Sequence, residues 1–194
     1  TSPSGSIVNG TATYAIGANG VLTLSSSIAS GSSDYMDFNP SGKFAYISSD
    51  NGERENSTET IHQYSVATDG SLMPLAVPTL TTDIISGWSS HIVFDPSGKF
   101  AFMAGQKGKV AGVYSPYDSS LGANTLYFPE TNSVIETYEV NANGALSLIS
   151  TLTLPSTPTL PTIAGITVNP VTNTLSAVTW NMNTDSSGDV TTQA

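Results

Sequence analysis

The feature that most constrains the fold is a short phrase that occurs almost unchanged at two places in the chain. Residues 35–47 read YMDFNPSGKFAYI, and residues 91–102 read HIVFDPSGKFAF. A degraded copy, ITVNPVTNTLSAVTW, follows at residues 166–180. The prolines of the three copies stand at positions 40, 96 and 170, so the spacings are 56 and 74 residues. Repetition at this spacing indicates a repeat architecture in which each copy builds one structural unit.

A second phrase alternates with the first. It reads YAIGANGVLTL at residues 14–24, YSVATDGSLMPL at residues 64–75 and YEVNANGALSLI at residues 138–149. Asn-Gly or Asp-Gly between alternating apolar residues is a strong β-hairpin signal, and we expect both central residues to adopt positive φ. The Pro-Ser-Gly of the first phrase is also typical of a tight turn. Each phrase therefore predicts one hairpin.

One hairpin of each kind gives a four-stranded unit, which is the size of a propeller blade. Apolar residues at helical spacing are missing, and Gly, Pro, Ser and Thr interrupt the chain every few residues. The sequence thus predicts an all-β chain, a β-propeller segment of four-stranded antiparallel blades. The strands suffice for about three blades, whereas rings have about 4 to 8. We therefore expect the segment to be part of a larger ring.

The phrases also predict how the 194 residues are divided. We expect an N-terminal segment, the outer hairpin of a split blade, one blade, a second blade with a long insertion, and a final inner hairpin with a C-terminal tail. In that order, the five predicted segments are residues 1–10, 11–31, 32–81, 82–158 (with the insertion at 105–133) and 159–194. The remaining blades would come from the same chain, from a cleaved half or from another subunit.

Composition excludes several classes of partner. The chain has 15 acidic and 5 basic residues, a formal net charge of -10, and no cysteine. This charge argues against nucleic acid and anionic lipid as partners, and the lack of thiols excludes disulfides and thiolate metal sites.

The composition also favours a secreted or cell-surface protein, because charges are few, Ser and Thr are many and the first residue is Thr. The sequence contains no run of 18 apolar residues, so it predicts no membrane span. Asn9 and Asn56 fit the glycosylation pattern if the source is eukaryotic.

Two residues are candidates for catalysis. His91 could act as a general base if a carboxylate and a water lay within reach, or it could simply be a hydrogen-bonded residue at a strand start. Arg54, in a long connection, could hold a carboxylate or phosphate in a bidentate manner. The flanking Glu53 and Glu55 offer a simpler role for Arg54, a solvated ion pair. His62 alternates with apolar residues on a predicted strand, which favours exposure on a blade face over catalysis.

Aromatic residues gather in the long insertion and could stack on a sugar or anchor a partner, or they could pin the insertion to its own blade. They are Tyr114, Tyr117, Tyr127 and Phe128.

Motifs for a metal or a cofactor are missing from the sequence. No His/Glu arrangement has zinc spacing, and no phosphate loop or nucleophile elbow is present. The sequence predicts no metal and no cofactor.

The phrases FDPSGKFAFM and YEVNANGALSLIS resemble those of the lactonase-type β-propellers, which include 6-phosphogluconolactonases and carboxymuconate-cyclase-like enzymes with seven blades. The resemblance covers residues 14–180 and implies that about half a ring is present. Catalytic members carry Pro-His five residues before the Asp-Pro, whereas this chain has Ser90 there and His91 one place later. The resemblance therefore implies the fold more than lactone hydrolysis.

Two functions follow from the sequence. One is a non-enzymatic propeller that binds a partner or builds an extracellular assembly; the polar surface and the missing family motifs favour it. The alternative is a cofactor-free lactone hydrolase or a cycloisomerase of the muconate-cyclase type, with its site in the central channel. That enzyme would act on a small anionic lactone or a carbohydrate.

Overall fold

The computed structural model describes residues 10–28, 35–49, 58–85, 91–107, 132–154, 160–184 and 190–191. These residues form antiparallel strands joined by turns, and no helix occurs among them, which confirms the all-β prediction. In the described parts there is accordingly no helix long and apolar enough to cross a membrane. The strands are β1 (Thr11–Ile16), β2 (Leu22–Ile28), β3 (Tyr35–Phe38), β4 (Phe44–Ser49), β5 (Thr58–Val66), β6 (Leu72–Ile85), β7 (Ile92–Phe94), β8 (Phe100–Lys107), β9 (Asn132–Val140), β10 (Leu146–Thr153), β11 (Leu160–Asn169), β12 (Thr174–Thr184) and β13 (Val190–Thr191).

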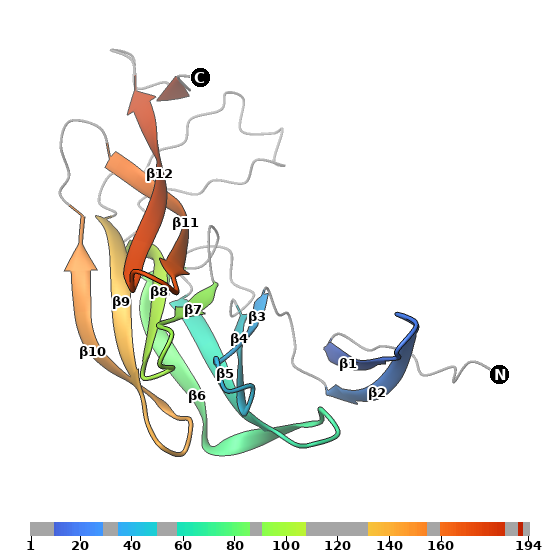
Figure 1. Ribbon diagram of the computed structural model, residues 1–194. Coiled ribbons are helices and arrows are strands. Elements are labelled where there is room, and N and C mark those ends of the chain that lie inside the picture. Colours follow the sequence, from blue (N-terminus) through green and yellow to red (C-terminus); the bar gives the residue numbers. More distant parts are fainter. Residues whose placement is uncertain are drawn as a thin grey trace, which may run out of the picture.

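The strands form two four-stranded meanders flanked by two hairpins (Figure 1). One meander has the order β3-β4-β5-β6 and the other β7-β8-β9-β10. A single bridge, Ile85 to Gln106, joins them into one continuous sheet. The hairpin β1–β2 stands at one end of the arrangement, and β11–β12 stands at the other with β13 on its edge. This is a β-propeller segment with about three blades' worth of strands.

The three Asn/Asp-Gly phrases form hairpins, but their turn type differs from the expected one. Only the glycines have positive φ, at 80° for Gly20, 81° for Gly70 and 87° for Gly144. Each glycine N–H donates to the carbonyl three residues earlier, as Gly144 does to Asn141 at 2.8 Å. The turn is therefore type I with a left-handed glycine as its third loop residue. In this turn the Asn or Asp before glycine keeps negative φ, so our expectation of two positive values was wrong.

The Asn/Asp-Pro phrases form the other tight turns, and their first side chain holds the loop together. Asp95 accepts hydrogen bonds from the backbone N–H groups of Ser97 (3.1 Å) and Phe100 (2.8 Å), and from the Ser97 hydroxyl. Asn39 does the same work in the first copy, where its Oδ1 accepts from the N–H groups of Lys43 and Phe44, each at 3.1 Å. An oxygen acceptor at this position is what the turn requires, and Asn and Asp both supply one.

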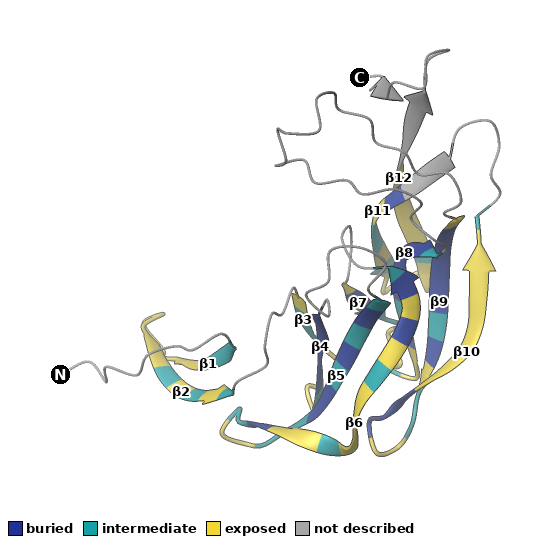
Figure 2. Ribbon diagram, turned by 180° about the vertical axis from the view of Figure 1, so that it is seen from behind, coloured by how far each residue is buried: buried dark blue, intermediate teal, exposed yellow. Residues whose placement is uncertain are grey.

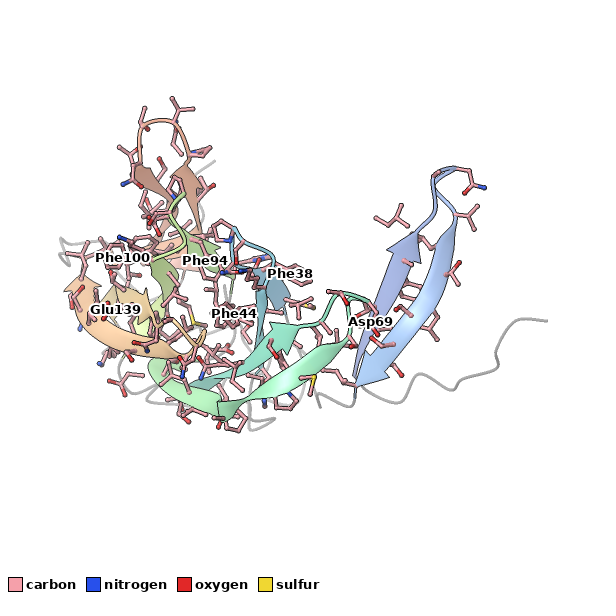
Figure 3. All side chains as sticks on the ribbon, turned by 60° about the horizontal axis from the view of Figure 1, so that its bottom comes forward. Phe38, Phe44, Asp69, Phe94, Phe100 and Glu139 are labelled. Carbon is pink, nitrogen blue, oxygen red and sulfur yellow. The ribbon has the colours of Figure 1, made fainter. Side chains whose placement is uncertain are left out.

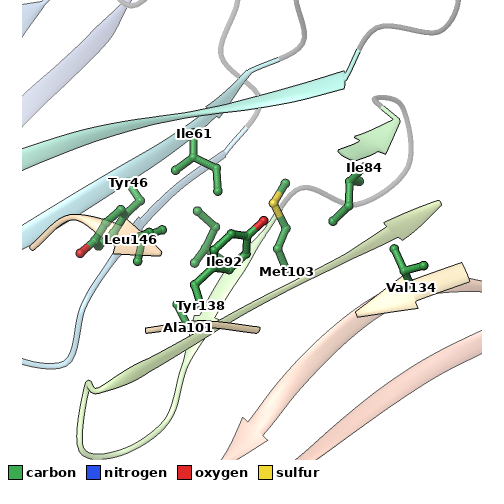
Figure 4. Close-up of a cluster of buried hydrophobic side chains, with 9 residues drawn as sticks. All are labelled: Tyr46, Ile61, Ile84, Ile92, Ala101, Met103, Val134, Tyr138 and Leu146. Atoms are coloured by element: carbon green, nitrogen blue, oxygen red, sulfur yellow. The ribbon is translucent and has the colours of Figure 1, made fainter. Parts of the chain in front are cut away.

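The main core lies between the two meanders (Figure 4). Tyr138 of β9 is 1% exposed there, and its ring packs among apolar side chains from both units, including Ile61 and Met103. Polar contacts also join the units: the Tyr46 hydroxyl donates to the Gly144 carbonyl at 2.7 Å. A smaller core, with Ile135 and Ile163, joins the second meander to β11–β12. Burial of these faces is what positions the successive units against one another (Figure 2).

All the tight turns of the two meanders lie at the same end of the strands. The turns follow β3, β5, β7 and β9, so the connections after β4, β6 and β8 leave from the opposite end. The long connections 50–57 and 108–131, which lie outside the described residues, therefore start and finish at that opposite end, named here the loop end. Long connections are where function concentrates in a rigid scaffold.

Candidate functional site

The candidate site lies at the loop end, where the innermost strands of the two meanders begin. Tyr35 is the first residue of β3, and His91 directly precedes β7. These two strands neighbour one another although 54 residues separate Asp37 from His91. The inner strands thus bring together side chains that belong to different repeats of the sequence.

Asp37 is the residue that organises the site. Its Oδ2 accepts a hydrogen bond from the backbone N–H of Ile92 at 2.9 Å, which fixes the carboxylate against the start of β7. The same carboxylate lies beside the His91 ring, with Nδ1 at 3.4 Å from Oδ2 and 3.5 Å from Oδ1. A carboxylate in this place favours the tautomer that carries the proton on Nδ1, which leaves Nε2 as an acceptor.

Tyr35 completes the cluster by stacking on the imidazole. The two ring centroids are 3.9 Å apart and the rings are tilted by 37°. The His91 side chain is 49% exposed and that of Asp37 is 25% exposed. The imidazole is therefore held from two sides and remains open to solvent, which a group that exchanges protons with a bound molecule needs.

Of the predicted site residues, His91 is the one that the structure describes. His91 has the neighbouring carboxylate that its proposed role requires. Arg54, Asn9 and Asn56 lie outside the described residues, as do the four aromatic residues of the insertion, Tyr114, Tyr117, Tyr127 and Phe128. The strand ends that flank these two connections, Ser49 and Thr58 for one and Lys107 and Asn132 for the other, lie at the loop end, as His91 does.

Sequence analysis missed Asp37 and Tyr35, although the repeat held a signal for both. When the copies are aligned on their prolines, Tyr35 falls at the place of His91 and Asp37 falls at the place of Val93. A carboxylate at an inner-strand position that is apolar in the sister copy has no packing reason to be there. A comparison of the copies position by position would have singled it out.

His62 differs from the exposed residue that we predicted. Its ring is half-buried on β5 and lies 2.9 Å from the hydroxyl of Ser49, which is 5% exposed. Burial lowers the pKa of His62, so the neutral ring is favoured. The pair ties β4 to β5 across the first meander.

A second polar group lies deeper at the loop end. Glu136 is fully buried; its Oε2 accepts a hydrogen bond from the Tyr138 hydroxyl, and its Oε1 has no hydrogen-bond partner among the described residues. Burial, followed by this hydrogen bond, raises the pKa of Tyr138. Lys107 at the end of β8 pairs with Asp83 at 2.5 Å; the hydrogen bond with Asp83 raises the pKa of Lys107, with a smaller contribution from Glu136. The Lys107–Asp83 pair joins the two meanders.

Comparisons with known proteins add a limited finding. No protein-family profile matches the chain, and no curated protein matches it in sequence. Among solved structures, it is similar to a protein of Bacteroides fragilis assigned as a 6-phosphogluconolactonase, with 15% identity, a TM-score of 0.42 and coverage of 95% of this chain and 63% of that one. It is also similar to a periplasmic gluconolactonase of Pseudomonas aeruginosa, with 14% identity, a TM-score of 0.42 and coverage of 92% and 61%. The chain thus spans less than two thirds of either structure, and these values permit no transfer of residue roles.

Proposed function

We propose that the His91 cluster is a general-base site that hydrolyses a lactone. The observation that carries this proposal is the Asp37 carboxylate, 3.4 Å from Nδ1 of an imidazole whose side chain is 49% exposed. A His held in one tautomer by a carboxylate can take a proton through its other nitrogen. A cyclic ester as substrate is what the resemblance of the repeated phrases implies.

The reaction balances without a cofactor. Nε2 of His91 removes a proton from water as the water oxygen attacks the lactone carbonyl carbon. The ring C–O bond then breaks, and the proton on Nε2 passes to the departing ring oxygen, which gives a hydroxy acid. Asp37 keeps Nδ1 protonated and stabilises the imidazolium between the two transfers. Arg54 remains a prediction as the group that binds an anionic substituent of the substrate.

The test is lactone opening measured with 6-phosphogluconolactone and with unphosphorylated lactones. We expect His91→Ala to lower kcat/KM by about 10² to 10⁴, the usual contribution of a general base. Asp37→Asn keeps an oxygen for the Ile92 N–H but removes the charge, so we expect a smaller loss that falls on kcat. His62→Gln, which changes the other imidazole, should leave the rate unchanged. Equal rates for the wild type and His91→Ala would refute the site.

A second candidate function is the non-enzymatic binding or assembly module, secreted or displayed at the cell surface. The observation that favours it is the apolar side chains of β1–β2 that face solvent, among them Ile16 at 78% and Leu22 at 60% exposure. Apolar surface of this kind marks an interaction site. Absence of opening for every lactone, in chains shown to be fully assembled, would favour this function over hydrolysis.

A further inference from the structure

One row of polar side chains crosses the first meander on the side that faces the second. Asp37, Tyr46 and Gln63 lie directly opposite one another on β3, β4 and β5, so they share one face of the sheet. Tyr46 and Gln63 are fully buried, and the Asp37 side chain, on the innermost strand, is 25% exposed. These three residues are named here the polar row.

The two buried members of the polar row hold the β9–β10 hairpin of the second meander near its turn (Figure 4). The Tyr46 hydroxyl donates to the Gly144 carbonyl at 2.7 Å, and Oε1 of Gln63 accepts from the Leu146 N–H at 2.7 Å. Nε2 of Gln63 donates to the Val77 carbonyl of its own meander at 3.0 Å, which fixes the amide for its contact with Leu146. Burial raises the pKa of Tyr46, so its hydroxyl remains protonated and able to donate.

The third member of the row belongs to the candidate site. Asp37 accepts from the N–H of Ile92 at 2.9 Å, and its carboxylate lies 3.4 Å from Nδ1 of His91. The second distance is at the outer limit of a hydrogen bond, so a small displacement of the second meander would separate the two groups. The contact between Asp37 and His91 therefore depends on what holds the two meanders together.

The second meander carries different residues at the places of the polar row. In the same order they are Val93, Phe102 and Thr137, again opposite one another on three strands. The side chains of Val93 and Phe102 have no hydrogen-bonding group, and Phe102 packs against the small core that contains Ile163. Packing of one unit on the next therefore does not require a polar row. The row is a property of the junction that carries the His91 cluster.

We propose that Tyr46 and Gln63 are positioning residues for the His91 cluster. They hold the second meander against the first by two buried hydrogen bonds, which keeps His91 beside the Asp37 carboxylate. A displacement of about 1 Å at a catalytic group can cost about 10² in rate, even when the changed residue lies far from the chemistry. The catalytic part of this inference rests on the lactone hydrolysis proposed above, whereas the placing of His91 does not.

The first test follows the His91 imidazole by NMR. The chain has two histidines, and the variant His62→Gln identifies the signals of each. At a pH above about 8, where histidine side chains are neutral as a rule, we expect His91 to carry its proton on Nδ1. Tyr46→Phe and Gln63→Thr introduce the residues that the second meander has at these places. Each should shift His91 toward the tautomer with the proton on Nε2, and the double variant should shift it most.

The matched control is Ile61→Val. Ile61 lies on β5 in the same buried core, and its side chain makes no hydrogen bond. Loss of one methylene lowers stability but leaves the polar row intact, so the tautomer of His91 should stay as in the wild type. A tautomer that is unchanged in the double variant overturns the proposal. An equal shift in Ile61→Val also overturns it, because any loosening of the core would then be sufficient.

The second test measures lactone opening by the same chains. We expect the double variant Tyr46→Phe/Gln63→Thr to lower kcat by about tenfold and to leave KM unchanged, because no group that touches the substrate is removed. A shifted tautomer with an unchanged kcat overturns the catalytic part of the proposal. A shifted tautomer in chains of which none opens a lactone, the wild type included, supports the placing of His91 and counts against the proposed function alone.

Discussion

The hairpins β1–β2 and β9–β10 carry the same phrase but lie in different surroundings. Their turns are alike, with a left-handed glycine and an Asn side chain that accepts the N–H two residues on. Yet Tyr138 is 1% exposed and its counterpart Tyr14 is 43% exposed, and Leu146 is 5% exposed while Leu22 is 60% exposed. The phrase therefore specifies a hairpin and an apolar face, and the neighbouring strands decide whether that face is buried.

The neighbours differ in a simple way. β9 pairs with β8, and its Tyr138 face meets the first meander through Tyr46 and Ile61. β1–β2 touches the first meander at the β5–β6 turn, where the Ser25 hydroxyl donates to the Asp69 carbonyl at 3.0 Å (Figure 3), and at Ile28, which packs against the small apolar cluster that contains Tyr64. One polar contact and one partly buried side chain remove little apolar surface from water, so they stabilise far less than a packed face.

The largest expected difference between the two hairpins comes from removing the equivalent tyrosine side chain from each. Tyr138→Ala opens a cavity between the meanders and leaves Glu136 without its donor, so we expect the free energy of unfolding to fall by about 3–5 kcal/mol. Tyr14→Ala should cost only about 0.5 kcal/mol, because Tyr14 is 43% exposed. Chemical denaturation at low protein concentration measures both. Similar losses would show that β1–β2 is packed as tightly as β9–β10.

The Asn/Asp-Pro turns offer a second comparison of smaller effect. Asp95→Ala leaves the N–H groups of Ser97 and Phe100 without their acceptor, and we expect a loss of about 1–3 kcal/mol. Asp95→Asn should cost less, because Asn39 holds the sister turn with the same acceptor.

The pH dependence of the same turn has a definite sign. Burial opposes ionisation of Asp95, but the hydrogen bonds from Ser97, Phe100 and Lys99 outweigh it and lower its pKa. The contribution of Asp95 to stability is therefore present above the unfolded value of about 3.9 and is lost as the pH falls through the folded pKa. Asp95→Asn should remove this dependence in denaturation curves measured between neutral and acid pH. An unchanged profile would contradict the assignment.

The smallest expected effect concerns His62. Burial lowers the pKa of His62, so the unfolded chain, with a value of about 6.5, binds the proton more readily than the folded chain. Stability should fall as the pH drops through 6.5 and then level off below the folded pKa. His62→Gln should flatten this slope, as measured by chemical denaturation across this pH range. The same slope in His62→Gln would exclude His62 as its source.

Much of the fold was accessible from the repeated phrases. The hairpins at Gly20, Gly70 and Gly144 follow from local turn chemistry, because a left-handed glycine is needed wherever the chain reverses in this way. The Pro-Ser-Gly turns at Pro40 and Pro96 follow in the same way, because Gly42 and Gly98 have positive φ. The type of the Asn/Asp-Gly turn was wrongly predicted, since Asn-Gly is compatible with two hairpin loops, which differ in φ and in their backbone hydrogen bonds.

The candidate site was accessible only in part. His91 was recognised by residue type, but its partner Asp37 stands in a different repeat, and pairing across repeats depends on how two inner strands lie side by side. No spacing along the chain encodes that distance. Arg54 and the aromatic residues of the insertion remain predictions for the same site.

By itself, the sequence determined the local structure of this protein: where the chain turns, which residues alternate along each strand, and which side chain closes each turn. These properties depend on contacts within a few residues. The tertiary structure alone decided that Tyr138 is buried while Tyr14 is exposed, and that Asp37 meets His91. Those properties depend on which strands become neighbours, and burial acts through total apolar area and not through any one phrase.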